Sequence, residues 1–198
     1  EVAEATKVIE NVQRDINIAL VNELAQIFPE LDLDVEYVLS AAATKWNFHR
    51  YTPGIGVGGH CIPVDPYYMM QRAQEVGVPA ELITAARAVN RMMPRHVSGV
   101  LRELLYRAGV PADGGRVLFL GWSYKAGVGD ARETPADPLA ENLIEAGVSV
   151  STWDPYLTAE DIPDGINLIE DIDSARDFDK VVLATAHSEC VNLDWQAL

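Results

Sequence analysis

The segment Arg116-Val-Leu-Phe-Leu-Gly121 is a short apolar run with a charged residue before it and a glycine at its end. Successive apolar residues between such boundaries are typical of a parallel strand that is buried on both faces. Two further runs follow, over residues 148–153 and 179–185. Between the runs, the sequence predicts a helix over residues 134–146 and a helix-like stretch over residues 171–176. Alternating strands and helices predict a parallel, Rossmann-like α/β sheet.

The sequence before this strand predicts helices instead. Apolar residues recur every three or four positions from Val2 to about Phe28, which predicts a long amphipathic helix that Pro29 ends. Further helices are expected over residues 33–43, 66–75 and 80–108, with Pro94 kinking or splitting the last of them. Residues 109–115 have the composition of a linker. We therefore expect a helical domain over residues 1–108 and a Rossmann-like domain over residues 109–198.

The charge balance excludes some classes of partner. The 198 residues carry 30 Asp and Glu against 15 Lys and Arg, a net charge of -15. Such a surface repels nucleic acid and anionic membranes, so neither is expected as a partner.

No stretch of about 20 apolar residues predicts a membrane span, and two distant cysteines favour a reducing cytoplasm. Abundant acid and scarce lysine suggest adaptation to high salt, a hypothesis that stability insensitive to molar salt would refute.

The segment Gly54-Ile-Gly-Val-Gly-Gly-His-Cys-Ile-Pro-Val-Asp-Pro-Tyr-Tyr68 carries the candidate chemistry. Its glycines allow the backbone to turn tightly and to approach a ligand closely, which favours Cys61 as a nucleophile. Two alternatives remain open. Cys61 could be a small buried apolar residue, and Asp65 could be a helix N-cap. The pair His60 and Cys61 lacks a second Cys/His pair at ligand spacing, so we predict no metal site.

This loop resembles the G-x-G-G-x-C-x-x-x-D loop of the UDP-glucose/GDP-mannose 6-dehydrogenase family, through Gly56-Val-Gly-Gly-His-Cys-Ile-Pro-Val-Asp65. The opening helix is similar to that of the family through Glu4-Ala-Thr-Lys7, Asn11 and Asn17-Ile-Ala-Leu-Val-Asn-Glu23. The segments Leu120-Gly-Trp-Ser-Tyr-Lys125 and Asp130-Ala-Arg-Glu-Thr-Pro135 resemble the start of its nucleotide-sugar-binding domain. The resemblance covers nearly the whole chain, with the motifs in the family's order.

The resemblance implies an enzyme that oxidises the C6 hydroxyl of a nucleotide sugar to a carboxylate with two NAD+. Cys61 would add to the intermediate aldehyde and carry it as a thiohemiacetal and then a thioester. Lys7 and Asn11, four residues apart on one helix face, would stabilise the oxyanions. Asp65 would act as general base or orient the lysine or the hydrolytic water.

The resemblance also implies the binding residues. Residues 50–58 would wrap the sugar and diphosphate, and Lys45 would reach the neighbouring subunit's site. Tyr124 and Lys125 would contact the nucleotide sugar, and Arg132 the NAD diphosphate. The substrate-binding set is therefore Lys45, Arg50, Tyr51, Thr52, Gly54, Gly58, Tyr124 and Lys125. The long first helix would form the core of a homodimer.

Departures from the family's pattern bear on the expected substrate and on the domains that the chain contains. His60 and Val64 make the loop more similar to the branch that acts on UDP-N-acetylhexosamines, such as UDP-N-acetylmannosamine. No G-x-G-x-x-G follows any predicted strand, so the family's amino-terminal NAD-binding domain is missing, and the chain stops before its terminal strand. The fragment alone is therefore expected to be inactive. The alternatives are UDP-glucose as substrate, a nucleotide-sugar-binding or dimerisation module with an idle cysteine, and a cysteine hydrolase or acyltransferase.

Overall fold

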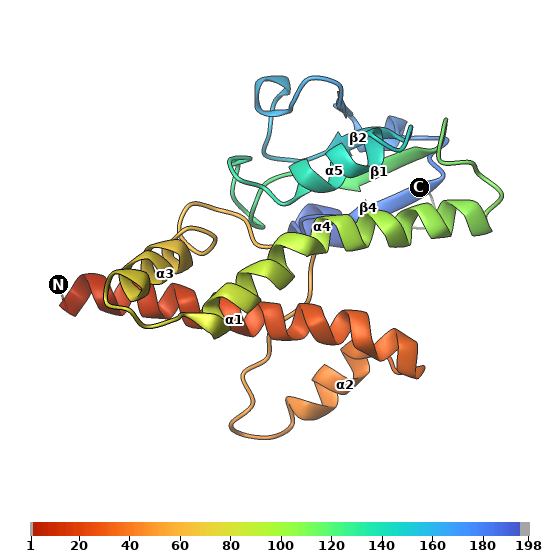
Figure 1. The fold of residues 1–198 in the computed structure, drawn as a ribbon. Coiled ribbons are helices and arrows are strands. Elements are labelled where there is room, and N and C mark those ends of the chain that lie inside the picture. Colours follow the sequence, from red (N-terminus) through yellow and green to blue (C-terminus); the bar gives the residue numbers. More distant parts are fainter. Residues whose placement is uncertain (1, 195–198) are drawn as a thin grey trace. The chain divides into compact units, whose positions relative to one another are not determined.

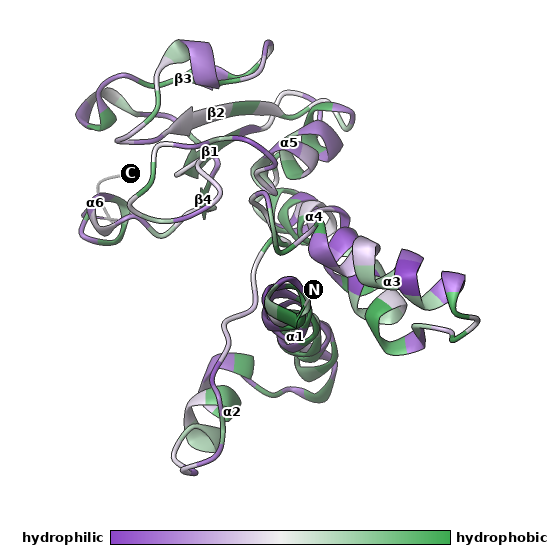
Figure 2. Ribbon diagram, turned by 90° about the vertical axis from the view of Figure 1, so that its left-hand side faces the viewer, coloured by the Kyte–Doolittle hydropathy of each residue, from purple (hydrophilic) through white to green (hydrophobic). Residues whose placement is uncertain are grey.

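The amphipathic pattern at the start of the chain forms helix α1, Val2–Ile27, in a computed structural model that describes residues 2–194 (Figure 1). One face of α1 is buried at intervals of three and four residues, through Val12, Asp15, Ala19 and Asn22. Viewed close to its axis in Figure 2, α1 carries both hydrophobic and hydrophilic residues. The helix ends before Pro29, which lies in a single 3-10 turn, η1 (Phe28–Leu31), as expected for a residue without a backbone N–H.

Three more helices follow, and their bounds are α2 (Val35–Ala42), α3 (Asp65–Glu75) and α4 (Glu81–Arg107). The predicted helices are confirmed to within three residues at each end. Asp34 caps α2, because its side chain accepts hydrogen bonds from the backbone of Glu36 and Tyr37. Helix α3 packs along α1, which places the end of the glycine loop against the first helix (Figure 1).

Of the two effects expected of Pro94, a split of the last long helix is wrong, because α4 is a continuous α-helix through that residue, and a kink stays a prediction. The proline removes one backbone hydrogen bond, to the carbonyl of Asn90 four residues earlier. Asn90, Met93, Pro94 and Ser98 are all buried, so packing holds the turn that the missing bond would weaken. By its internal contacts the chain divides into two units at this position, Glu1–Met93 and Pro94–Leu198.

The second unit contains a four-stranded parallel sheet in the order β3-β2-β1-β4. Its elements are β1 (Arg116–Leu120), α5 (Ala136–Ile144), β2 (Ser149–Trp153), η2 (Ala159–Asp161), β3 (Asn167–Leu168), η3 (Ile172–Ser174), β4 (Lys180–Leu183) and α6 (Ser188–Val191). The predicted α/β class and parallel sheet are confirmed. The sequence pattern missed β3 and α6, which are only two and four residues long.

The central strand explains why the sheet is stable. Residues 117–120 of β1 are fully buried, since β1 pairs with β2 on one side and with β4 on the other. Leu118 and Leu120 pack with Ala175 and Cys190 in one cluster, and α5 contributes the buried Leu139 and Leu143. A strand covered on both faces needs the near-continuous apolar run found in this sequence.

Across residues 2–194, no helix is both long enough and apolar enough to cross a membrane.

Candidate functional site

Cys61 lies at the end of the glycine loop, immediately before α3. Its carbonyl oxygen accepts hydrogen bonds from the backbone N–H groups of Val64, at 3.1 Å, and Asp65, at 2.8 Å. These bonds form a tight turn between the thiol and the first residue of the helix. Cys61 is half-buried and is in the reduced form. A partly accessible thiol on a hydrogen-bonded turn differs from the alternative of a cysteine sealed in the apolar core.

Asp65 reaches from the start of α3 to α1. Its Oδ2 accepts a hydrogen bond from Asn11 Nδ2 at 2.5 Å, and Asp65 is 8% exposed. Asp65 is itself the first residue of α3, and the N-cap position belongs to Val64. The carboxylate therefore bonds to the opposite helix, and the alternative of Asp65 as an N-cap is wrong.

Three of the four predicted catalytic residues are thus joined by hydrogen bonds, from Cys61 through Asp65 to Asn11. Lys7 lies one turn before Asn11 on α1 and is solvent-exposed. Positions four apart share one helix face, so Lys7 extends on the same face of α1 as the amide of Asn11. The assigned catalytic roles stay predictions.

A buried polar network anchors the start of the glycine loop, and the sequence pattern did not predict it. The backbone N–H of Gly54 donates to Asn22 Oδ1 at 2.9 Å. Asn22 Nδ2 donates to Asn90 Oδ1 at 2.9 Å, and Asn90 Nδ2 donates to Asp15 Oδ1 at 2.8 Å. The network thereby ties the loop to both α1 and α4. Its only sequence signal was the presence of polar residues on the buried face of an apolar helix.

An ion pair completes this network. Arg87 Nη1 lies 2.6 Å from Asp15 Oδ1, with both side chains buried. Burial raises the pKa of the Asp15 carboxyl above its usual range, and the Arg87 charge offsets part of that effect. The ring of Tyr67 lies 5.7 Å from the Arg87 guanidinium carbon, a cation–π distance. Asp15 Oδ2 and Arg87 Nε are buried without a hydrogen-bond partner, which makes the pair costly to break.

The predicted substrate residues of the first unit lie on the loop before Cys61. Lys45, Arg50 and Thr52 are exposed, whereas Tyr51 and Gly58 are half-buried. Arg50 Nη2 forms an ion pair with Glu36 of α2. This pair fixes the start of residues 50–58, the segment predicted to wrap a diphosphate.

The predicted substrate residues of the second unit lie on the loop that follows β1, over residues 124–132. Tyr124 N donates to the carbonyl of Asp130 at 3.0 Å, which closes the loop at its base. Tyr124 is half-buried and Lys125 is exposed. At Gly129 a Cβ atom would lie 2.7 Å from the carbonyl oxygen of Tyr156, so this side of the loop packs closely on the segment after β2. Lys125 projects from a loop whose base is fixed.

Arg132 was predicted to meet the NAD diphosphate. Its Nε and Nη2 donate to the two carboxylate oxygens of Asp130 at 3.0 and 2.8 Å, and the guanidinium is otherwise exposed. A hollow of about 430 Å³ beside it is also lined by Glu160 and Asp161. Three carboxylates against one guanidinium do not make a diphosphate site, so these residues fit at most a single phosphate contact.

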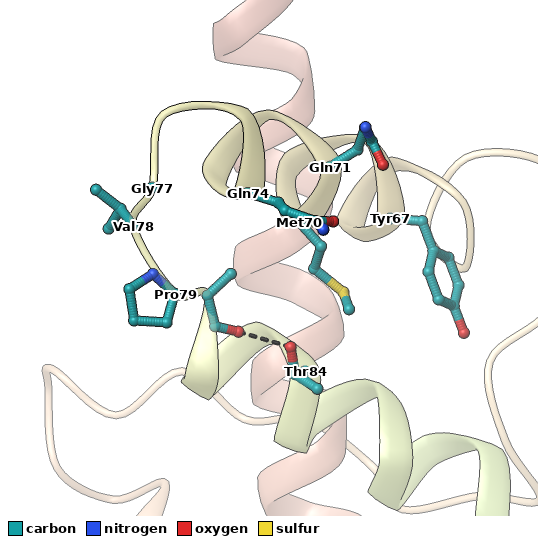
Figure 3. Close-up of a pocket in the computed structure, with 9 residues that line it drawn as sticks. Tyr67, Met70, Gln71, Gln74, Gly77, Val78, Pro79 and Thr84 are labelled. Atoms are coloured by element: carbon teal, nitrogen blue, oxygen red, sulfur yellow. Dashed lines mark hydrogen bonds between the residues drawn. The ribbon is translucent and has the colours of Figure 1, made fainter.

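A second hollow, of about 570 Å³, lies between α3 and the start of α4. Figure 3 shows Met70 extending from α3 toward α4, where Thr84 Oγ1 donates to the Ala80 carbonyl at 2.8 Å. No predicted catalytic or binding residue lines it, and its lining has no acid or base other than Tyr67. Within the described residues, no three His, Cys, Asp or Glu side chains gather as a metal site would require.

A helical unit that presents a cysteine loop, joined in sequence to a parallel α/β unit, is the arrangement found in nucleotide-sugar dehydrogenases. The model of the UDP-glucose/GDP-mannose dehydrogenase family's central domain matches residues 1–92, and that of the family's UDP-binding domain matches residues 118–198. This chain belongs to the UDP-glucose/GDP-mannose dehydrogenase family, which confirms the resemblance found in the sequence.

Individual relatives agree with this placement. The chain is 44% identical over 195 residues to UDP-N-acetyl-D-glucosamine 6-dehydrogenase of Pseudomonas aeruginosa, covering 98% of this chain and 46% of that protein. The solved UDP-D-ManNAc dehydrogenase of Pyrococcus horikoshii has a TM-score of 0.86 at 33% identity, covering 99% of this chain and 44% of that one. The UDP-glucose dehydrogenase of Pyrobaculum islandicum also has a TM-score of 0.86, at 27% identity, covering 98% of this chain and 45% of that one. The chain spans less than half the length of these relatives.

Proposed function

We propose that this chain forms the thiol-bearing and nucleotide-sugar-binding units of an NAD-dependent dehydrogenase that oxidises the C6 hydroxyl of a UDP-N-acetylhexosamine to a carboxylate. Family membership supports the reaction class. His60 and Val64 in the loop support the N-acetylhexosamine branch. The similarity of the chain to dehydrogenases named for UDP-N-acetyl-D-glucosamine and UDP-N-acetyl-D-mannosamine supports the same branch. The observation that carries the proposal is the Asn11–Asp65 hydrogen bond at the end of the turn that begins at Cys61.

Cys61 is proposed to bind the C6 carbon of the sugar covalently between the two oxidations. After the first oxidation, Cys61 Sγ adds to the aldehyde carbon and the aldehyde oxygen takes up a proton in place of the one the thiol loses, which forms a thiohemiacetal. Loss of the hydride from this carbon and of the proton from its hydroxyl leaves a thioester. Water then attacks the thioester, the carbon–sulfur bond breaks, and the carboxylate and the thiol are released. Bound NAD would supply the hydride acceptor for both oxidations.

The residues beside Cys61 are proposed to stabilise charge and to move the proton. Each tetrahedral state carries an oxyanion, and the ammonium of Lys7 and the amide of Asn11 are donors on one face of α1. The hydrogen bond to Asp65 fixes the orientation of the Asn11 carboxamide. As a carboxylate on the first residue of α3, Asp65 is also the candidate base for the hydrolytic water.

Substrate-binding residues are proposed within each unit. Residues 50–58 offer backbone N–H groups to the diphosphate, with Lys45 reaching the neighbouring subunit's site. Tyr124 and Lys125 contact the nucleotide sugar from the second unit. Arg132 contributes one contact to a cofactor phosphate, while the rest of the NAD site lies in other parts of the complete enzyme. The chain alone is therefore expected to be inactive.

The proposed assembly is a cytoplasmic homodimer formed through α1. The apolar side chains Val2, Ile9, Leu20 and Ile27 are 83%, 53%, 52% and 45% exposed. Their spacings of seven and eleven residues place all four on one side of the helix, separate from the buried side. An apolar stripe of this kind on a long helix fits a second copy of the same helix.

The test is turnover by the complete enzyme with NAD+ across a panel of UDP-hexoses and UDP-N-acetylhexosamines. Two NADH per sugar are expected, with the highest kcat/KM for a UDP-N-acetylhexosamine. Cys61→Ala is expected to remove the second NADH, because no thiohemiacetal can form. Preference for UDP-glucose would overturn the substrate assignment. Full turnover by Cys61→Ala would favour a nucleotide-sugar-binding module in which this cysteine is idle.

A further inference from the structure

A buried histidine connects the predicted nucleotide-sugar loop to the end of a neighbouring strand. His187 follows β4 and is fully buried. The backbone N–H of Gly127, in the middle of the 124–132 loop, donates to His187 Nδ1 at 3.1 Å. On the opposite side of the ring, His187 Nε2 lies 3.1 Å from Asp154 Oδ2, just after β2. The imidazole thus bridges a loop and a carboxylate that are far apart in sequence.

These two contacts fix the protonation state of the ring. Nδ1 accepts a hydrogen bond from an amide, so this nitrogen carries no proton. Nε2 faces a carboxylate and therefore carries the proton and donates it. The neutral ring has one donor and one acceptor, and both are used. Protonation of Nδ1 would direct its new N–H against the N–H of Gly127 and remove that contact.

The carboxylate behind the ring is firmly held. Asp154 Oδ2 also accepts from Trp122 N at 2.7 Å, from Ser123 N at 2.8 Å and from Ser123 Oγ at 2.9 Å. Burial acts to raise the pKa of Asp154, but the backbone donors outweigh it, so the pKa lies below its usual range. Asp154 thereby fixes both the stem of the loop, at residues 122–123, and the ring that supports its middle.

We propose that His187 is a positioning residue for nucleoside-diphosphate binding, whose neutral Nε2–H ring holds Gly127 and with it the 124–132 loop in the conformation that presents Tyr124 and Lys125. The proposal rests on the proposed function, which assigns those two residues to the nucleotide sugar. Gly127 itself has a φ of 72°, a left-handed conformation that few other residues adopt readily. A loop that turns at such a residue depends on an external contact to keep one conformation.

Other titratable groups lie around the ring. Asp154 contacts Nε2 from the end of β2, and Glu189 follows in α6. Tyr156 packs on the ring at 5.0 Å between centroids, and its hydroxyl donates to Glu189 Oε1 at 2.7 Å. Cys190 in α6 is buried and its pKa is raised to about 12, first by burial and then by Asp154 and Glu189, so it stays neutral.

Two variants separate the two bonds of the ring. His187→Asn keeps a polar acceptor near the position of Nδ1 and loses the donor to Asp154. His187→Gln keeps a donor near the position of Nε2 and loses the acceptor for Gly127. Each variant removes one of two buried hydrogen bonds, so their losses of thermal stability are expected to be similar. A merely structural role therefore predicts equal effects of the two variants on UDP binding.

The experiment measures UDP affinity of the chain by titration calorimetry for the wild type and both variants, with amide hydrogen exchange at Gly127. His187→Gln is expected to weaken UDP binding by about fivefold to tenfold, the worth of one hydrogen bond. His187→Asn is expected to stay within about twofold of the wild type. Gly127 exchange is expected to be faster in His187→Gln than in His187→Asn. Equal UDP affinities and equal Gly127 exchange in the two variants would overturn the proposal.

A separate outcome distinguishes the proposed function. A wild-type chain that binds no UDP would overturn the nucleotide-sugar assignment, and Gly127 exchange alone would then decide whether His187 holds the loop. If neither variant folds, the proposal is tested on the His187 ring of the wild-type chain. Its nitrogen NMR spectrum is expected to show the neutral Nε2–H tautomer, with the amide of Gly127 protected from exchange. The opposite tautomer, or an unprotected Gly127 amide, would overturn the inference.

Discussion

Asp65 Oδ2 lies 2.5 Å from Asn11 Nδ2, so a residue of the cysteine turn and a residue of the opening helix are joined by a direct hydrogen bond. These positions are 54 residues apart in the sequence. The bond joins α3 to α1 across the contact between the two helices. The Asp65 carboxylate makes no capping bond to its own helix.

Asp65→Asn is expected to lower kcat of the complete enzyme by about 100-fold to 10,000-fold, the usual contribution of general acid–base catalysis. Loss of the base would leave a thioester on Cys61, which mass spectrometry of the quenched enzyme detects. Asp34→Ala is the control, because Asp34 caps α2. It should cost about 1 kcal/mol of stability without changing turnover. If Asp65→Asn behaved like this control, Asp65 would have a structural role only.

The two cysteines are expected to differ sharply in reactivity. Burial, with the nearby Asp154 and Glu189, raises the pKa of Cys190 to about 12, so almost no thiolate forms at pH 8. Cys61 is half-buried on the loop. Iodoacetamide should therefore modify one thiol in the native chain and two in denaturant. Cys61→Ser should abolish native labelling while Cys190→Ser preserves it, and UDP-sugar should slow labelling. Faster modification of Cys190 would contradict the assignment.

Removing Arg87 is expected to be costly because it leaves the carboxylate of Asp15 buried without its partner. Arg87→Leu should lower the free energy of unfolding by about 3–5 kcal/mol. The loss should be larger at pH 8 than at pH 5, because Asp15 can take up a proton at the lower pH and avoid a buried charge.

Two further variants test this pair by denaturant unfolding. The double variant Asp15→Leu with Arg87→Met should recover most of the stability, since neither charge is then buried. Arg107→Leu breaks an exposed pair with Glu103 at 2.9 Å and should cost less than about 1 kcal/mol. A loss for Arg87→Leu no greater than that for Arg107→Leu would refute the expectation.

Asp137 is expected to make the chain less stable as the pH rises. Burial, reinforced by Glu141 and Glu133, raises its pKa to about 6, against about 4 in an unfolded chain. The folded state therefore binds this proton more tightly, and its contribution to stability is complete below pH 4 and is lost as the pH rises through about 6.

Asp137→Asn should remove this decline and stabilise the chain at pH 7 by about 1 kcal/mol, since solvent screens part of the effect. The difference in unfolding free energy between variant and wild type, measured from pH 4 to pH 7, tests this. Asp164→Asn changes an exposed aspartate and serves as the control. A difference that does not grow with pH would contradict the expected shift.

The exposed stripe on α1 is expected to hold the dimer together. Placing charges in it, with Ile9→Glu and Leu20→Glu combined, should yield monomers at concentrations where the wild type is dimeric. Sedimentation at high salt measures this without interference from the net charge of -15. Val76→Glu alters a side chain that is 68% exposed outside the stripe and should leave the dimer intact. A wild-type chain that sediments as a monomer at high concentration would refute the assembly.

Much of the fold could be predicted because the pattern of each element is local. The apolar spacing of residues 2–27 and the unbroken run of residues 117–120 each required a single type of element. Pro94 does not split α4, because burial of its neighbours offsets the lost hydrogen bond. Strand β3 was missed because two residues are too few to show a period of two.

A candidate site could be proposed from the sequence only where one short segment carries its residues. Cys61 and Asp65 are four residues apart, so a single loop displayed both. Asp154 and His187 are 33 residues apart and meet only because β2 and β4 flank β1 in a parallel sheet. Polar residues just after successive strands were the available signal, since the carboxyl ends of parallel strands share one edge.

The close approach of Gly129 to the Tyr156 carbonyl restricts which positions of the 124–132 loop can be varied. Even an alanine there would collide with backbone, and Gly127 is constrained by its left-handed turn. Freedom to diversify the loop therefore falls on Lys125, Ala126 and Val128. A library randomised at those three positions should retain folded members, whereas one that includes the two glycines would mostly encode misfolded chains.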